Sequence, residues 1–301
     1  MCIKLATYCI FVELGPSMKA VYKRIKEKVC RYVMERHCRM GGFCFYRIEE
    51  PNGLDTYCAL SILKLLDIPF HDDRTVAYLR DMQHEDGGYD SAFAAFYSLK
   101  SLAILEKSPL SNPLPYIRDH VDKDRVTAEK LPVEIFSVFH RMTYLVDLYT
   151  MFNKCRDESF EKRIIQYILT FHNRDSGFGY LKSTLGETAK ALIMLAKLHY
   201  TLKPLQAENF LRRCEIANYG FTNIPGASLS FLEFIHSGII ASSVLNYRPR
   251  YAKDCMVFIM NCQNRTGGFS RTTQNGIATL ENSFFAVQAL TMMSVFSGSR
   301  Q

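Results

Sequence analysis

A turn of glycine followed by an aromatic residue recurs along this chain at nearly constant spacing, and this recurrence limits the fold more than any other feature. The clear copies are Gly41-Gly42-Phe43, Gly87-Gly88-Tyr89 and Gly267-Gly268-Phe269, and the weaker ones are Gly177-Phe178 and Gly220-Phe221. The steps from Gly42 to Gly88, Gly177 to Gly220 and Gly220 to Gly268 are 46, 43 and 48 residues. Gly88 to Gly177 is 89 residues, about two such steps, which predicts an eroded copy near Glu134. A fixed period of this size indicates a stacked array of repeats, each burying its apolar face against its neighbours.

Each repeat has the pattern of two helices joined by the glycine turn. Glycines after a helix are typical of a C-terminal stop that needs positive φ, where a Cβ would clash. The helix before each turn carries charged residues on one face, as a water-facing outer helix does, and the helix after it is apolar on most sides, as a helix buried from two directions is. The predicted outer helices are Ala20–Arg36, Arg74–Met82, Pro115–Val121, Glu158–Phe171, Pro204–Cys214 and Pro249–Cys262. The predicted inner helices are Leu54–Leu66, Ser91–Leu105, Val133–Phe152, Thr184–Leu198, Ser228–Leu245 and Thr279–Phe296. With no strand pattern in any segment, the sequence predicts an all-α protein, an α/α toroid of six helical hairpins with an outer ring around a closed inner ring.

The repeats run without a linker, so we expect one toroid domain over residues 18–301 and an N-terminal extension over residues 1–17. Met1–Leu14 is apolar, with only Lys4 and Glu13 charged. It is too short to span a bilayer and lacks the features of a signal peptide, which leaves a leader or a strand-like arm packed on the toroid. Nothing else in the sequence suggests a transmembrane segment.

Charge and cysteine content narrow the class of protein. The net charge of +7 is moderate and its basic residues are spread over the outer helices, so we expect no nucleic-acid partner, whereas an anionic ligand such as a diphosphate is compatible. The ten cysteines lie mostly inside helices without a C-x-x-C pair, which favours reduced, buried thiols in a cytoplasmic protein over a disulfide framework.

The repeat resembles a known family. Gln83-x-x-Asp-Gly-Gly-Tyr89, and the helix that begins Leu54-Asp55-Thr56-Tyr57 after another such turn, are similar to the repeat of protein prenyltransferase β subunits and class II terpene cyclases. The resemblance covers nearly the whole chain. It implies an α/α toroid around an apolar cavity suited to an isoprenoid, but the repeat maintains the barrel and does not by itself specify the chemistry.

The zinc site that the resemblance implies for protein prenyltransferases is incomplete here. In that family an Asp and a Cys at the start of one inner helix, with a His from the following repeat, hold zinc and lower the pKa of a substrate thiol. The matching positions are Glu281, Ser283 and, after ring closure, Leu54. Because two of the three ligands are missing, we expect no metal and no other cofactor. His140 and His236 lie on inner helices without ligand spacing and are interpreted as core or cavity residues.

The acid that the resemblance implies for class II cyclases is also absent, because His71-Asp72-Asp73-Arg74 lacks an Asp two residues before Asp72. Asp73 is interpreted as the N-cap of the next helix. Five other acids stand near the starts of inner helices: Asp55, Asp90, Glu187, Glu233 and Glu281. They have two interpretations, helix-dipole partners or a polar rim at one mouth of the barrel. Under the second, Asp55 and Glu281 are the candidate catalytic residues.

Aromatic and basic residues supply the candidate substrate contacts. Aromatic side chains on inner helices either fill the core or, as the resemblance implies, coat an isoprenoid tunnel, since aromatic faces tolerate carbocation character. The candidates for this wall are Tyr57, Phe96, Phe139, Phe234 and Phe284. Basic residues follow three of the turns, at Arg47, Lys182 and Arg271, and are similar in position to family residues that contact the diphosphate.

Two functions remain open from the sequence. The favoured one is an isoprenoid-binding, prenyltransferase- or terpene cyclase-like enzyme that acts on a polyprenyl diphosphate without the standard zinc site. The alternative is a non-catalytic isoprenoid-binding or protein-interaction scaffold that retains the toroid. The partners expected are an isoprenoid or its diphosphate, and a partner protein subunit stays an open candidate.

Overall fold

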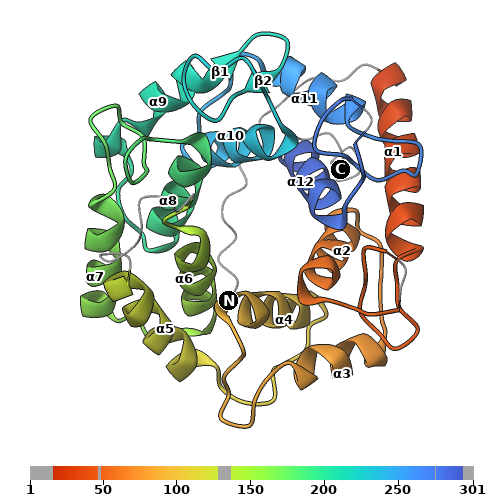
Figure 1. The fold of residues 1–301 in the computed structure, drawn as a ribbon, viewed down its shortest axis with the longest axis vertical. Helices are drawn as coiled ribbons and strands as arrows, with labels where there is room; N and C mark the ends of the chain where they lie inside the picture. The colour runs from red at the N-terminus through yellow and green to blue at the C-terminus, as the bar shows by residue number, and fades with distance from the viewer. Residues whose placement is uncertain (1–15, 47–48, 128–136, 275, 294–301) are drawn as a thin grey trace.

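The protein forms a closed double ring of helices (Figure 1). The computed structural model describes residues 16–46, 49–127, 137–274 and 276–293. The outer ring contains α1 (Pro16–Met34), α3 (Asp73–Asp81), α5 (Leu114–Thr127), α7 (Glu158–Leu169), α9 (Ala207–Cys214) and α11 (Ala252–Asn261). The inner ring contains α2 (Gly53–Leu65), α4 (Ala92–Ile104), α6 (His140–Phe152), α8 (Leu185–Lys197), α10 (Leu232–Val244) and α12 (Leu280–Met292). Each inner helix packs on the next, and α12 packs on α2, which closes the ring and confirms the predicted toroid.

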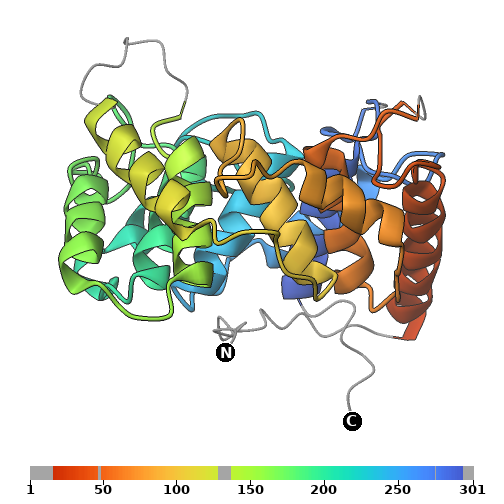
Figure 2. The same ribbon diagram turned by 90° about the horizontal axis from the view of Figure 1, so that it is seen from below.

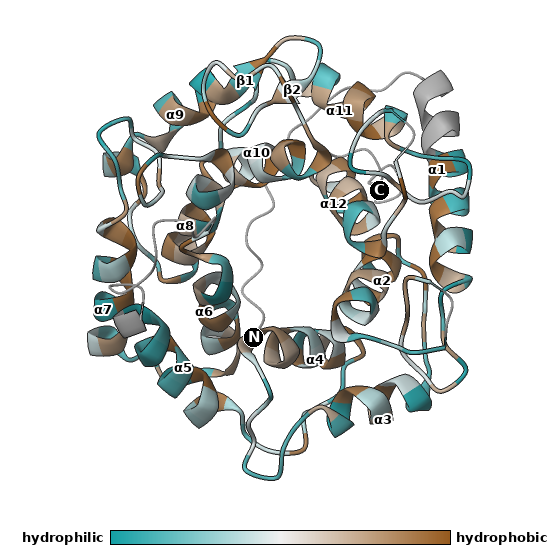
Figure 3. Ribbon diagram, in the orientation of Figure 1, coloured by the Kyte–Doolittle hydropathy of each residue, from teal (hydrophilic) through white to brown (hydrophobic). Residues whose placement is uncertain are grey.

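The inner helices are apolar because three of their sides are covered. Their backs pack on outer helices and their flanks on inner neighbours, which leaves one partly exposed stripe facing the centre of the ring. On α4 the stripe is Phe93, Tyr97, Lys100 and Ile104, with the spacing of one helical face. We call the side chains on these stripes the lumen face. Figure 3 shows the contrast in composition, with hydrophilic residues concentrated on outer helices such as α3 and α5.

The glycine turns bring each outer helix against the next hairpin. Gly41 and Gly267 have φ of 96° and 95°. A Cβ on Gly41 would lie 2.4 Å from the backbone carbonyl carbon of Arg74, and one on Gly267 would lie 2.4 Å from the carbonyl oxygen of Lys28. Both conformation and space therefore require glycine here.

The glutamine before the turn ties it to the following hairpin. Gln83 Nε2 donates to the carbonyl oxygen of Gly87 at 3.1 Å and to that of Ser111, just before α5, at 3.0 Å. Gln263 Nε2 donates to the carbonyl oxygen of Gly267 at 2.9 Å and reaches that of Ile25, in α1, at 3.5 Å. The same side chain thus links successive repeats and joins the last repeat to the first.

A hydroxyl in the first turn of the inner helix fixes the aromatic residue of three turns. The N–H groups of Phe43, Phe178 and Phe269 donate to hydroxyl oxygens at 3.0, 2.9 and 3.0 Å. The hydroxyls belong to Thr56, Thr188 and Ser283. This bond sets where each inner helix begins relative to its outer helix.

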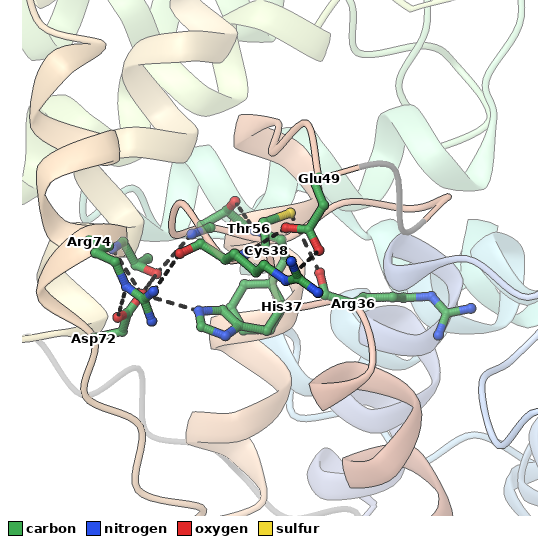
Figure 4. A network of polar contacts seen from close by, with 11 residues as sticks. Arg36, His37, Cys38, Glu49, Thr56, Asp72 and Arg74 are labelled. Carbon is green, nitrogen blue, oxygen red and sulfur yellow. Dashed lines mark hydrogen bonds and ion pairs between the residues drawn. The ribbon is translucent and has the colours of Figure 1, made fainter.

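Figure 4 shows the polar network around the first turn. Asp72 Oδ2 lies 3.1 Å from His37 Nε2 and accepts from Thr75 N at 3.0 Å, so Asp72, not the predicted Asp73, is the N-cap of α3. Burial opposes ionisation of Asp72, but its bonds to Thr75, His37 and Arg74 outweigh burial and lower the pKa to about 2. This carboxylate therefore fastens the turn after α1 to the start of α3, that is, the first hairpin to the second.

Three details differ from the sequence prediction. The fifth turn contains a two-stranded antiparallel pairing of β1 (Glu215–Ile216) with β2 (Gly220–Phe221), where no strand was predicted. Pairs this short carry no alternation for a sequence to display. A 3-10 turn, η2 (Lys203–Leu205), precedes α9, and α1 begins at Pro16, before the predicted Ala20. The eroded copy near Glu134 and residues 1–15 lie outside the described residues.

Within the described residues, no helix is both long and apolar enough to cross a membrane.

Candidate site on the lumen face

Aromatic rings form a continuous wall on one side of the lumen face. It runs from α12 through α2 and α4 to α6, with centroid distances of 5.6 Å for Phe284–Tyr57, 5.2 Å for Tyr57–Phe96 and 4.2 Å for the stacked pair Phe96–Tyr144. Phe93 and Tyr97 extend it along α4, 5.6 and 5.8 Å from Tyr144, and Phe285 extends it on α12, 6.0 Å from Phe284. Burial raises the pKa of Tyr57, Tyr97 and Tyr144, so these hydroxyls stay neutral. The wall is apolar with a few hydroxyl groups.

The predicted substrate-binding aromatics occupy three kinds of position. Tyr57 is partly exposed on the lumen face, and Phe96 and Phe284 are buried directly behind it in the wall. Phe234, on α10, contacts Phe231 at 5.3 Å and stands apart from the wall. Phe139 is fully buried against Phe171 and Phe178 of the fourth repeat, a core position that leaves no surface for a substrate.

Three acids meet near one end of the inner ring. Glu233, Glu281 and Asp55 lie near the starts of the adjacent helices α10, α12 and α2. Surrounding protein raises the pKa of Glu281, and the negative charges of Glu233 and Asp55 add to the effect. Glu281 is nevertheless solvent-accessible, since it lies at the end of a lumen stripe, and no hydrogen bond or ion pair holds it among the described residues. It is the acid best placed to exchange a proton with a ligand.

Asp55 differs from Glu281 in being anchored. It is buried, its carboxylate accepts from Asn52 Nδ2 at 2.5 Å, and its N–H donates to Asn52 Oδ1 at 2.8 Å. Burial raises the pKa of Asp55 although these bonds oppose the shift. Asp55 therefore serves the start of α2 and contributes negative charge beside Glu281.

The other acids at helix starts have local roles. Asp90 is exposed and lies 3.1 Å from His84 Nε2. Glu187 is buried and accepts from Val138 N, Phe139 N and Ser137 Oγ at 2.9, 3.1 and 2.6 Å, so it holds the segment that leads into α6. Glu187 is therefore not free to line a polar rim, whereas Asp90 lies exposed beside His84 in the second turn.

The predicted diphosphate contacts differ in whether their charge is already paired. Arg271 pairs with Glu233 and lies 4.1 Å over the ring of Phe231, so its charge is largely compensated. Lys182 is exposed and has no ion pair among the described residues. Arg47 lies outside the described residues.

The positions matched to zinc ligands have other partners. Ser283 is fully buried, donates to the carbonyl oxygen of Thr279 at 2.6 Å and accepts from Phe269 N. His236 lies 2.7 Å from Gln288 Oε1, and burial lowers its pKa to about 4. His140 is exposed at the end of the α6 stripe beside Phe93. No group of three or more His, Cys, Asp or Glu side chains is arranged for a metal in the part of the chain that the structure describes.

A charged cluster on the lumen face was missed by the sequence reasoning. Asp147, on α6, lies 3.2 Å from Lys100 Nζ of α4 and 2.5 Å from Lys197 Nζ of α8. It stands seven residues after His140 on the same stripe, towards the end of the ring opposite Glu281. The sequence signal that could have predicted this cluster is a charged residue in each of three otherwise apolar inner helices. The lumen face therefore carries aromatic rings along α12, α2, α4 and α6, and an ion-pair cluster around Asp147 towards the end opposite Glu281.

The cysteines found in the described residues are all free thiols. Six of these eight are buried, as expected for reduced, packed cysteines, and two, Cys30 and Cys155, are more accessible. None forms part of the aromatic wall.

Comparison with known proteins gives a family and two structural relatives. The model of the prenyltransferase alpha-alpha toroid domain matches residues 5–91 and 116–300. The Candida albicans protein geranylgeranyltransferase-I complexed with GGPP is similar with a TM-score of 0.55 and 18% identity, over 80% of this chain and 83% of that one. A protein from Actinoplanes is similar with a TM-score of 0.57 and 13% identity, over 90% of this chain and 99% of that one. No curated protein matches the sequence. At these identities the structural relatives establish the fold alone, whereas the match along most of the sequence shows that this chain belongs to the prenyltransferase alpha-alpha toroid family.

Proposed function

We propose that the protein binds the apolar chain of an isoprenoid diphosphate against the aromatic wall and acts on it at the end of the ring where Glu281 lies. The observation that supports this most is the continuous series of rings from Phe284 through Tyr57 and Phe96 to Tyr144. Such a wall gains roughly 25 cal/mol per Å² of apolar surface removed from water, and its ring faces favour developing positive charge. The GGPP in the Candida albicans relative is a ligand of this chemical class.

In this proposal the end of the ring near Glu281 and the aromatic wall have separate tasks. Glu281 moves a proton at the reacting end, and burial, with the added negative charges of Glu233 and Asp55, keeps its pKa raised. Lys182 and Arg271, with Arg47, are the proposed contacts of the diphosphate, and Arg271 would exchange its bond to Glu233 for one to phosphate. Tyr57 and Phe234 are proposed to touch the chain directly, whereas Phe96 and Phe284 support Tyr57 from behind.

The proposed chemistry does not use the standard zinc site. The hydroxyl of Ser283 is already bonded to Phe269 N and to the carbonyl oxygen of Thr279. A neutral hydroxyl is also a poor zinc ligand. We expect elemental analysis of chelator-free protein to give well under one zinc per chain, with a melting temperature unchanged by a chelator. Stoichiometric zinc would restore the metal-dependent prenyltransferase mechanism.

A single-tryptophan variant tests ligand binding directly. The sequence contains no tryptophan, so Tyr97→Trp places the only one on the wall and Leu110→Trp places it on an exposed loop at the opposite end of the ring as the control. Farnesyl diphosphate should change the fluorescence of the first variant and not of the second. Adding Lys182→Ala or Arg271→Ala should weaken the diphosphate by about tenfold, from roughly 1.5 kcal/mol for a lost charged hydrogen bond, and leave farnesol nearly unchanged.

The same titration separates the two candidate functions. Binding of farnesyl diphosphate together with turnover that Glu281→Gln abolishes supports an enzyme. Binding without turnover supports a non-catalytic isoprenoid carrier, and no binding by a folded protein supports a protein-interaction scaffold.

A further inference from the structure

Exposed apolar side chains gather on one end of the ring. Within the described residues, twelve large apolar side chains are exposed, and eight of them belong to loops that lead from an outer to an inner helix. These eight are Met40, Tyr46, Tyr180, Leu181, Tyr219, Ile224, Leu229 and Ile277. Because outer and inner helices alternate in direction, all these loops lie at the same end, along the upper edge of Figure 2. We call this end the turn face.

The side chains are too exposed to be edges of the core. Met40, Tyr46 and Ile277 are 74%, 73% and 74% exposed, and Leu181 and Leu229 are each 68% exposed. Tyr46 and Ile277 also border a surface pocket of about 400 Å³ where the first and last repeats meet. Clustered exposed apolar residues of this kind mark a surface that another apolar phase covers.

Positive charge accompanies the apolar side chains. The loops 170–184 and 262–279 carry exposed Arg174, Lys182 and Arg265, none with an ion pair among the described residues. Two acids beside these loops are used internally, since Asp175 accepts from Gly177 N and Ser183 Oγ and Glu215 binds Tyr247 and Arg250 N. Glu281, at the start of α12, and Glu49 and Glu50, in the first loop, stay exposed.

The second loop shows the opposite composition. Residues 83–91 expose Glu85, Asp86 and Asp90 and carry no large exposed apolar side chain. Exposed apolar residues and unpaired cations therefore occur together on the sector formed by the loops 170–184, 214–231 and 262–279, whereas the second loop is acidic.

We propose that this sector of the turn face docks on an anionic phospholipid bilayer. Apolar side chains would enter the headgroup boundary while Arg174, Lys182 and Arg265 meet lipid phosphates, the pattern by which peripheral surfaces bind charged membranes. Charge complementarity selects a lipid surface over a neutral apolar partner. The inference rests on the proposed function, because Glu233 and Glu281 lie at the same end of the ring and an isoprenoid dissolved in the bilayer would meet the lumen there.

Vesicle cosedimentation with the full chain tests the docking. Vesicles of phosphatidylcholine with about one-third phosphatidylglycerol, free of isoprenoid, should bind the protein, and pure phosphatidylcholine should bind it at least about tenfold more weakly. The double variant Leu181→Ser/Leu229→Ser should lose about tenfold or more in vesicle affinity. Leu110→Ser is the matched control, because Leu110 is 63% exposed on the opposite end of the ring. It should bind as the unmodified protein does, and Lys182→Glu should weaken only the binding to anionic vesicles.

Three results would overturn the proposal: no binding to anionic vesicles, equal loss in the Leu110→Ser control, or full binding by the double variant. If the folded protein does not bind vesicles but forms a stoichiometric complex with an acidic protein, the surface is a protein-binding site instead. The Tyr97→Trp titration in vesicle-free buffer keeps the two proposals apart. Farnesyl diphosphate binding without vesicle binding rejects the docking alone, and vesicle binding without farnesyl diphosphate binding rejects the proposed function alone.

Discussion

The junction of α12 with α2 and the sector around α6 hold their inner helices by different means. At the junction, neutral hydrogen bonds from Phe43 N to Thr56 and from Phe269 N to Ser283 fix the helix starts to the glycine turns, and Asp55 adds only a local bond at the start of α2. Around α6, carboxylates hold the helix in place. Glu187 accepts from the backbone N–H groups just before α6, and Asp147 pairs with lysines of the neighbouring helices α4 and α8. The glycine turn is absent from the sequence just before α6, so charged side chains occupy the place of a backbone motif.

This difference indicates that the toroid tolerates the loss of one glycine turn when the buried carboxylate of Glu187 holds the same segment. A hydroxyl bonded to backbone is insensitive to pH and salt, whereas a carboxylate pair depends on ionisation and on its partners. The two regions should therefore fail under different conditions.

The largest effect is expected where the ring closes. Gly267→Ala should lower the free energy of unfolding by about 3 kcal/mol or more, because it adds positive-φ strain and a clash with the backbone of Lys28. Gly226→Ala is the matched control, since Gly226 also has positive φ but nothing within 4 Å of its Cβ position. It should cost about 1 kcal/mol in urea denaturation. Equal losses would mean that strain, and not the contact with α1, makes glycine necessary.

The next effect tests the replacement in the third repeat. Glu187→Gln should cost about 2 kcal/mol, because buried N–H groups of Val138 and Phe139 lose a charged acceptor. Hydrogen exchange should accelerate in α6 more than in α2. Lys190→Met removes the partly exposed ion pair with Glu187 and the bond from Lys190 Nζ to Ser137 Oγ, but leaves the backbone bonds of Glu187 in place, and should cost less than about 1 kcal/mol. Uniform acceleration around the ring would show that the sector is not held separately.

These two regions also differ in how far the sequence predicts them. The glycine turns, the six hairpins and the closure of α12 on α2 follow from periodicity, because each turn repeats its chemistry locally. The site is harder, since Asp147, Lys100 and Lys197 come from three repeats and only the closed ring brings them together. Sequence reasoning likewise placed Phe139 with the substrate aromatics, although packing on Phe178 buries it, and could not show that Glu233 compensates Arg271.

A smaller, pH-dependent effect is expected at Asp147. Burial opposes its ionisation, but Lys100 and Lys197 outweigh burial and hold the pKa below its ordinary value of 3.8. The stabilisation is therefore complete above about pH 4 and is lost as the pH falls through the folded-state pKa. Asp147→Asn should cost about 1 to 2 kcal/mol at pH 7, and the difference from the unmodified protein should shrink below about pH 4. A difference that is constant with pH would contradict the ion-pair explanation.

The smallest effect concerns the hydroxyl at the junction. Ser283→Ala should cost about 1 kcal/mol for the bond to Phe269 N, independently of pH between 5 and 8 in thermal denaturation. Ser283→Thr should be nearly neutral, because threonine already occupies this role at positions 56 and 188. A loss with threonine as large as that with alanine would point to packing in place of the hydroxyl.

The contact of Tyr32 with the last hairpin has a kinetic consequence. Its hydroxyl donates to the carbonyl oxygen of Ala278 at 2.7 Å across 246 residues of chain. Most pairings in the ring join neighbouring repeats and can form early, but this one requires both ends of the array to meet, which costs loop-closure entropy. Folding should therefore proceed through an open arc whose final closure is slow, and α1 should gain its full protection only after the sixth hairpin has been made.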